Sequence, residues 1–190
     1  MKKISILLTG LAFSVGFGQE FSTDAPVVNT QTTGANEVLW EQVPDGTSGI
    51  VSDSDANGSA VYSADDFELV ANSKITKITA HGFVNSADLE NNLTGVSFYI
   101  IEDDQFFPLG SNPSEDAMFK FELAVGDAGL EIVHDNATTI YSFVLDLDAL
   151  GAEVILPANR YWLSVIANTT LGDITVGSTR WNWYQSMIGD

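Results

Sequence analysis

The hydrophobic positions of the chain form short runs, many of them alternating, and turn residues separate these runs. In the stretch 117–125, Phe119, Phe121 and Leu123 alternate with Lys120 and Glu122. A period of two places the apolar side chains on one face of a β-strand. The same pattern predicts about nine short strands, over residues 38–43, 59–70, 75–84, 94–101, 117–125, 139–147, 153–156, 160–168 and 179–185.

Helical periodicity is weak after the first eighteen residues. Single helical turns near residues 111–116 and 146–152 are the best candidates. Many short strands with turn signals between them are typical of all-β proteins. We therefore expect an all-β fold, an antiparallel β-sandwich of the jelly-roll-like type.

The first eighteen residues have a different pattern. Lys2 and Lys3 precede an apolar run over residues 4–17, and Gly16 and Gly18 provide small residues for a cleavage site. This is the pattern of a secretory signal peptide, and it is too short for a membrane span. We expect cleavage after Gly18, a secreted or cell-surface location, and no membrane span in the mature chain.

The remaining sequence divides into a leader and one domain. Residues 19–37 are small and polar and predict a flexible leader. Residues 38–190 predict one β-sandwich domain, and we expect it to be the N-terminal part of a longer protein. The sequence contains no cysteine, which excludes disulfides, thiolate metal sites and a lipid-anchored cysteine.

The chain is strongly acidic. All 26 acidic residues and five of the seven basic residues follow position 18, which gives the mature chain a net charge of −21. Such a surface repels nucleic acid and anionic lipid and attracts divalent cations. We therefore expect no nucleic-acid partner, and solubility explains most of these carboxylates.

One acidic stretch matches part of a calcium-binding loop. Asp53, Asp55 and Asn57 alternate and are followed by Gly58, as in the first half of an oxygen-ligand loop. The twelfth position, where an EF-hand has glutamate, is an alanine, and Asp65 follows it. We predict a structural calcium ion held by Asp53, Asp55, Asn57 and Asp65, with no other cofactor. The alternative is an exposed acidic turn.

A second motif places two indoles together. Trp181 and Trp183 are two residues apart in a predicted strand and therefore project to the same side. A pair of aromatic rings on a sheet face is suited to stacking on sugar rings, which predicts a ligand-binding surface. The alternative is that both side chains belong to the core, where large aromatics are common.

Catalytic signatures are absent from the sequence. It has no zinc-protease, nucleophile-elbow or phosphate-loop motif, and its only histidines are His81 and His134. A serine hydrolase triad would have to use one of these two. We expect a protein that is not an enzyme.

Four stretches, taken in order, carry a family resemblance. They are residues 64–69 (ADDFEL), 75–83 (ITKITAHGF), 156–165 (LPANRYWLSV) and 181–183 (WNW). Together they resemble the non-catalytic β-sandwich modules of exported, multidomain Bacteroidetes-type proteins, with Asn159 standing where that pattern usually has glycine. The resemblance implies a jelly-roll-like module and no known activity.

This resemblance leads to a function hypothesis with two alternatives. We expect an exported module for adhesion or glycan binding, with a polysaccharide or cell-surface glycan as its partner. The alternatives are an accessory domain of a secreted hydrolase and a structural spacer. The sequence leaves the ligand and the oligomeric state open.

Overall fold

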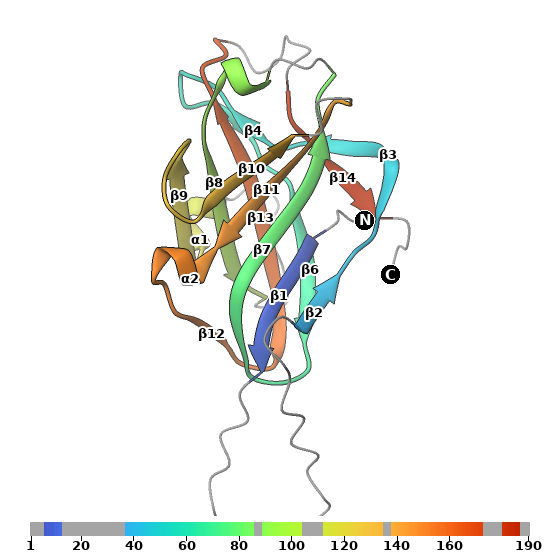
Figure 1. The fold of residues 1–190 in the computed structure, drawn as a ribbon, viewed down its shortest axis with the longest axis vertical. Coiled ribbons are helices and arrows are strands. Elements are labelled where there is room, and N and C mark those ends of the chain that lie inside the picture. Colours follow the sequence, from blue (N-terminus) through green and yellow to red (C-terminus); the bar gives the residue numbers. More distant parts are fainter. Residues whose placement is uncertain are drawn as a thin grey trace, which may run out of the picture.

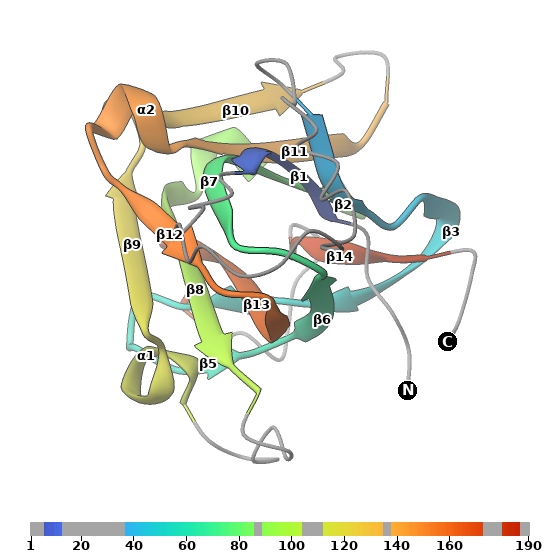
Figure 2. The same cartoon turned by 90° about the horizontal axis from the view of Figure 1, so that it is seen from below.

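The computed structural model of the chain describes residues 6–12, 37–85, 89–103, 112–134, 138–172 and 180–186. These residues form antiparallel and mixed β-sheets in two packed layers (Figures 1 and 2). The predicted all-β class is thereby confirmed. Within these ranges no helix has the length and apolar character needed to cross a bilayer. Residues 19–36 of the predicted leader lie outside the described residues, and Glu37 begins a strand.

The first layer is built around one long strand, β7 (Ser73–Phe83). β7 pairs antiparallel with four other strands, β11, β1, β12 and β14. β10 extends the sheet beyond β11, β2 extends it beyond β1, and β3 pairs with β14. The bounds of these strands are β1 (Ile6–Ala12), β2 (Glu37–Glu41), β3 (Pro44–Val51), β10 (Leu130–His134), β11 (Ile140–Asp146), β12 (Val154–Leu156) and β14 (Asn182–Ser186).

The second layer is built around β13 (Asn159–Thr169). β8 pairs with one edge of β13, and β9 continues the sheet beyond β8. Along the other edge β6 pairs antiparallel and β4 pairs parallel with β13, while β5 pairs with β4. The bounds of these strands are β4 (Asp53–Ser54), β5 (Ala60–Val61), β6 (Ala64–Leu69), β8 (Leu93–Glu102) and β9 (Phe119–Ala124).

Buried serines hold β4 and β6 on the same edge of β13. The chain leaves this edge after β4 and returns to it at β6. Ser52 donates a hydrogen bond to the carbonyl of Val165 at 2.6 Å, and Ser63 donates one to the carbonyl of Val51 at 2.9 Å. Ser164 of β13 donates to the carbonyl of Ser63 at 2.8 Å. These bonds close the base of the excursion, so its turn is fixed against the sheet.

The short helices have clear start and stop signals. α1 (Pro113–Asp116) starts after Asn112, whose side chain accepts a hydrogen bond from the backbone N–H of Ser114. α2 (Leu147–Leu150) is capped in the same way by Asp146 and ends at Gly151, which has φ +65°. Polar N-caps and a glycine C-cap satisfy the free backbone groups at helix ends. Both predicted helical turns are confirmed in position. A 3-10 turn, η1 (Leu89–Asn91), precedes β8.

The core lies between the two layers and contains Trp181 and Trp183, two of the four tryptophans. Trp181 and Trp183 are 0% exposed, and the ring centroid of Trp181 lies 4.6 Å from that of Phe143 and 6.1 Å from that of Trp183. Gly82 of β7 permits this packing, because a Cβ atom there would clash with the Trp181 ring. The two indoles share one side, as expected, but that side faces the core. In this arrangement neither ring is available to a sugar.

Besides β1, the strands β3, β4 and β10 arise where none was predicted. The turn-rich stretch after residue 43 forms β3, which contains Gly46 and Gly49 and is held by pairing with β14. A Cβ atom on Gly49 would meet the backbone carbonyl of Trp183 and the ring of Phe83, so the close pairing needs glycine. β10 forms as an edge strand beside β11. β3 depends on β14, which is distant in sequence. β10 buries no complete apolar face, so its sequence carries only a weak strand signal.

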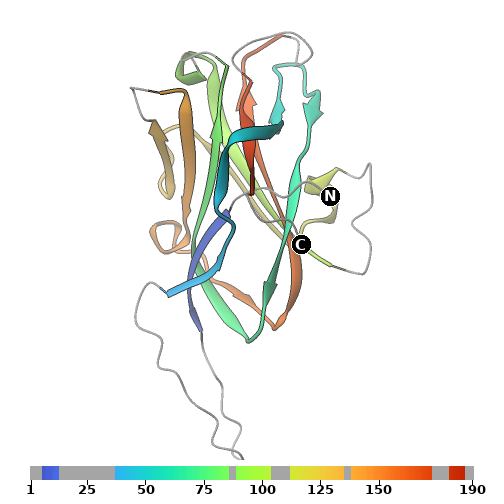
Figure 3. The ribbon, with the colours of Figure 1, turned by 90° about the vertical axis from the view of Figure 1, so that its right-hand side faces the viewer.

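β1 comes from within the predicted signal peptide. It lies between β7 and β2 and pairs antiparallel with both (Figures 1 and 3). Leu8 stands opposite Ile78 of β7 on one side and opposite Trp40 of β2 on the other. The expectation left residues 1–18 outside the folded domain, whereas the structure pairs seven of them with the sheet. Cleavage after Gly18 stays a prediction.

The buried indole of Trp183 predicts a large effect on stability. Trp183→Ala should lower the free energy of unfolding by about 3–5 kcal/mol, because it removes a fully buried aromatic and leaves a cavity. Val70→Ala is the control, since Val70 is 93% exposed; it should change the free energy by about 0.5 kcal/mol or less. Denaturant titration monitored by circular dichroism measures both. Equal stability of the two variants would contradict the core position of Trp183.

Candidate functional site

Asp53, the first predicted calcium ligand, forms a buried ion pair. It begins β4, opposite Ala167 of β13, and has no exposed surface. The Nε atom of Arg180 lies 3.1 and 3.0 Å from the two carboxylate oxygens of Asp53, and Nη2 also contacts Oδ1. Burial raises the pKa of the Asp53 carboxyl, and the Arg180 guanidinium acts in the opposite direction. The guanidinium thus occupies the position of a cation beside this carboxylate.

Asp55 and Asn57 form a self-bonded turn. One carboxylate oxygen of Asp55 accepts hydrogen bonds from the backbone N–H groups of Asn57 at 2.8 Å and Ser59 at 2.9 Å. Asn57 donates to the carbonyl of Gly172 at 2.8 Å, and Gly58 takes φ +81° at the bend. This is the hydrogen bonding of an Asx-type turn. The alternating acidic pattern therefore has a structural explanation that requires no ion.

Asp65 is distant from this turn. It lies buried in β6, opposite Leu163, whereas Asp53 stands opposite Ala167 of the same β13. Four residues of strand separate these two register positions by about 13 Å. One ion cannot contact both side chains over that distance. Within the described part of the chain no three histidine or acidic side chains are grouped so as to hold a metal ion. The calcium ion stays a prediction.

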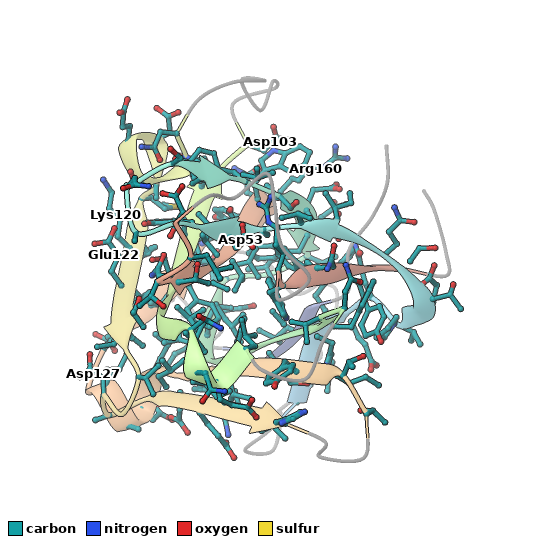
Figure 4. The ribbon with its side chains drawn as sticks, turned by 90° about the horizontal axis from the view of Figure 1, so that it is seen from above. Asp53, Asp103, Lys120, Glu122, Asp127 and Arg160 are labelled. Atoms are coloured by element: carbon teal, nitrogen blue, oxygen red, sulfur yellow. The ribbon has the colours of Figure 1, made fainter. Side chains whose placement is uncertain are left out.

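The outer face of the second layer carries a hydrogen-bonded row of polar side chains, of which Glu122 is exposed, Ser54 and Asn168 are half-buried, and Ser97 and Tyr99 are buried. Ser54 of β4 donates to the Asn168 side-chain carbonyl of β13 at 2.9 Å, and the Asn168 amide donates to Ser97 of β8 at 2.9 Å. Tyr99 of β8 donates to Glu122 of β9 at 2.6 Å. We call these five residues, Ser54, Ser97, Tyr99, Glu122 and Asn168, the polar strip. It crosses four strands, and Figure 4 shows Glu122 beside Lys120 on β9.

An aromatic side chain borders the polar strip. Tyr62 precedes β6, is 40% exposed and interacts electrostatically with Tyr99. At the other end of β13, Trp162 donates its indole N–H to Asp103 at 3.3 Å, and Arg160 lies between Asp66 and Asp103. Figure 4 shows Asp103 and Arg160 close together. The outer face thus combines hydrogen-bond donors, acceptors and rings, which are the groups that bind polar organic ligands.

Sequence reasoning missed the polar strip because its members are scattered over residues 54–168. Only the register joins them: Ser97 stands opposite Ile166 in β13 and opposite Glu122 in β9. A signal was present in the stretch 96–101, where Val96, Phe98 and Ile100 alternate with Ser97 and Tyr99. The apolar residues of this alternation identified the face toward the core. The residues between them, Ser97 and Tyr99, therefore belong to the outward face.

The environment of Tyr99 stabilises its neutral form. Burial, together with the hydrogen bond to Glu122, raises the pKa of Tyr99 to about 12. A phenolate here would lose hydration and face the Glu122 carboxylate, and both effects favour the protonated phenol. At neutral pH the phenol O–H is therefore a fixed donor to Glu122.

Both histidines contact side chains across strands or turns. Nδ1 of His81 lies 2.7 Å from the hydroxyl oxygen of Ser142, the residue opposite it in β11. Burial lowers the pKa of His81, and Glu41 acts in the opposite direction. His134 stacks on Tyr141 and contacts Glu90. A serine–histidine contact does not by itself make a hydrolytic site, since acyl transfer also needs donors for the oxyanion.

Comparison with known proteins gives no further guidance. No protein-family model matches the sequence, and neither the curated proteins nor the solved structures contain a match.

The ion pair predicts a specific loss of stability. Asp53→Asn should cost about 3–5 kcal/mol, because it leaves the Arg180 charge buried without its partner. The matched control is Glu131→Gln, an isosteric change at an exposed position of β10, which should cost about 0.5 kcal/mol or less. Denaturant titrations of both variants give the comparison. A cost for Asp53→Asn no larger than that of the control would show that the pair does not hold the loop.

The Tyr99–Glu122 hydrogen bond predicts a pH dependence. The pKa of Tyr99 is raised from 10.0 to about 12, so its stabilising contribution is complete below pH 10 and is lost as the pH rises to 12. Glu122→Gln removes the negative charge and should lower the Tyr99 pKa. Ultraviolet titration of phenolate, with Tyr99→Phe as the subtraction reference and Glu131→Gln as the control, measures the change. If the midpoint of the Tyr99 titration is the same in Glu122→Gln as in the wild type, Glu122 does not raise the pKa of Tyr99.

Proposed function

We propose that the mature chain is an exported, non-catalytic β-sandwich module of jelly-roll-like type that binds a glycan. The observation that carries this proposal is the polar strip with Tyr62 at its border. The half-buried Ser54 and Asn168 and the exposed Glu122 offer hydroxyl, amide and carboxylate groups, and Tyr62 offers a partly exposed ring. The buried Ser97 and Tyr99 hold Asn168 and Glu122 by hydrogen bonds. Sugars are recognised by such combinations, because hydroxyl groups need hydrogen bonds and C–H faces pack on rings.

The site on this face replaces the one expected at Trp181 and Trp183. Its residues belong to strands of a single sheet, so the backbone holds their spacing without a ligand. Pre-positioned polar groups reduce the entropy lost on binding. The same arrangement supports adhesion to a cell-surface glycan, which is the form of the function favoured by the resemblance to exported modules.

The charge of the protein narrows the class of glycan. The mature chain carries a net charge of −21, and Glu122 lies within the strip. Such a potential repels uronic acids and sulfated sugars. The proposed ligand is therefore a neutral polysaccharide whose hydroxyl groups bond the accessible members of the strip, Ser54, Asn168 and Glu122.

A binding experiment with matched variants tests the function. The exported protein should bind at least one neutral glycan on an array, and calorimetry should give a dissociation constant that rises about tenfold or more in Tyr62→Ala and in Asn168→Ala. A tenfold change corresponds to the loss of one good contact, about 1.4 kcal/mol. Glu131→Gln, on the other layer, is the control and should bind as the wild type does.

Two results would contradict the proposal. One is the absence of binding to every neutral glycan by a protein that melts cooperatively. The other is unchanged affinity in Tyr62→Ala and Asn168→Ala, with melting temperatures equal to that of the wild type, since the glycan would then bind elsewhere.

A further inference from the structure

The position of β1 has a consequence for the exported protein. β1 fills the space between β7 and β2, with Ile6 opposite Ala80, Leu8 opposite Ile78 and Gly10 opposite Ile75 (Figure 1). All three β7 residues are fully buried. We call the space occupied by β1 the strand slot. It is defined on one side by β7 from Ser73 to Ala80 and on the other by β2.

Export empties the strand slot. This step rests on the proposed export, because cleavage after Gly18 removes residues 6–12 together with the rest of the signal peptide. The edges of β7 and β2 that face β1 then lose their hydrogen-bond partners. The β7 edge carries the buried apolar residues Ile75 and Ile78. Unpaired strand edges beside an apolar surface are sites where another strand adds to a sheet.

The register of β1 defines the direction and sequence that a replacement strand needs. It must run antiparallel to both β7 and β2, as β1 does. The positions of Ile6, Leu8 and Gly10 stand opposite Ala80, Ile78 and Ile75, with a register shift between positions 9 and 10. The segment Ile6–Ala12, with the sequence ILLTGLA, contains no charge and no proline. A charged residue would leave a buried charge in the slot. A proline would remove a hydrogen bond of the strand ladder.

The chain itself has no equivalent segment in its leader. Between Gly18 and Glu37, the longest run without charge or proline is VVNTQTTGAN, residues 27–36. Its only two large aliphatic residues, Val27 and Val28, are adjacent and would project to opposite faces of a strand. A second mature copy has lost the same seven residues and cannot donate them. The leader and a second mature copy therefore offer no replacement strand.

We propose that the mature module accepts, in the strand slot, an extended uncharged segment of a partner protein that adds as an antiparallel strand between β7 and β2. The donated segment has about seven residues, the length of β1. It carries aliphatic side chains at alternate positions toward the core. This mode of binding obtains affinity from backbone hydrogen bonds and specificity from the alternate side chains. The module would thus join a partner chain through the first layer while the polar strip lies on the second.

Mass spectrometry of the exported protein comes first, because it separates the two proposals. Gln19 as the first residue supports the export on which the inference depends. Retention of Met1 would overturn both the proposed export and the empty slot. Only the protein that begins at Gln19 is used in the next step.

The probe is a synthetic peptide of residues 2–12, KKISILLTGLA, in which the two lysines maintain solubility. The mature protein should bind this peptide in a saturable manner and melt several degrees higher in its presence. The Leu8→Pro peptide should not bind, because proline removes a backbone donor at the centre of the strand. The uncleaved chain should not bind the peptide either, since its slot is filled. Failure of the wild-type peptide to bind a mature protein that begins at Gln19 would overturn the strand slot and leave export intact.

A disulfide test fixes the location and register. The protein has no cysteine, and position 9 of β1 stands opposite Lys77, whose side chain is 42% exposed. A Thr9→Cys peptide should therefore form a disulfide with the Lys77→Cys protein under mild oxidation. The Lys120→Cys protein, with its cysteine on β9 of the other layer, is the matched control and should react about tenfold less. Equal reaction of the two proteins would show that the peptide binds without register and would overturn the proposal.

Discussion

Burial of Trp181 and Trp183 between the two layers is the interaction on which the rest of the structure depends. The Trp181 ring packs against Gly82 of the central strand β7, and within the described part of the chain its indole nitrogen has no hydrogen-bond partner. Packing must therefore outweigh the cost of the buried N–H. With the indoles buried, β14 pairs with β3 and β7. Arg180, the residue before Trp181, then contacts Asp53.

The loop around Asp53 and the outer face of the second layer use polar groups differently. In the loop, the carboxylates of Asp53 and Asp55 bind a guanidinium and backbone N–H groups, so their acceptor capacity is used within the protein. On the outer face, the polar strip crosses strands beside the partly exposed Tyr62, and its buried members Ser97 and Tyr99 bond the more accessible Asn168 and Glu122. The accessible members can exchange bonds with a ligand at small cost, because solvent or ligand replaces them.

Local sequence patterns predicted the strands, but they did not predict contacts between residues that are distant in sequence. Alternation in Phe119, Phe121 and Leu123 predicted β9 because neighbours in sequence fix the two faces of a strand. The role of Asp53 could not be predicted, since its partner is 127 residues away and the motif around it also suits calcium. The sequence also did not determine whether Trp181 and Trp183 face the core or the solvent. Their spacing places them on the same side of a strand, but it does not say which side is buried. Tyr99 and Glu122 meet only through register.

The place of β13 in the sequence has a consequence for synthesis. β13 is the common neighbour of β4, β6 and β8, and the residues of β13 follow all three in the chain. The second layer therefore cannot be completed until the ribosome has passed Thr169, and before that only the β4–β5 and β8–β9 pairs can form. Sheets closed by such distant contacts fold slowly. Until then the edges of β6 and β8 that later pair with β13 stay open, and unpaired strand edges of this kind are where a nascent chain is prone to aggregate.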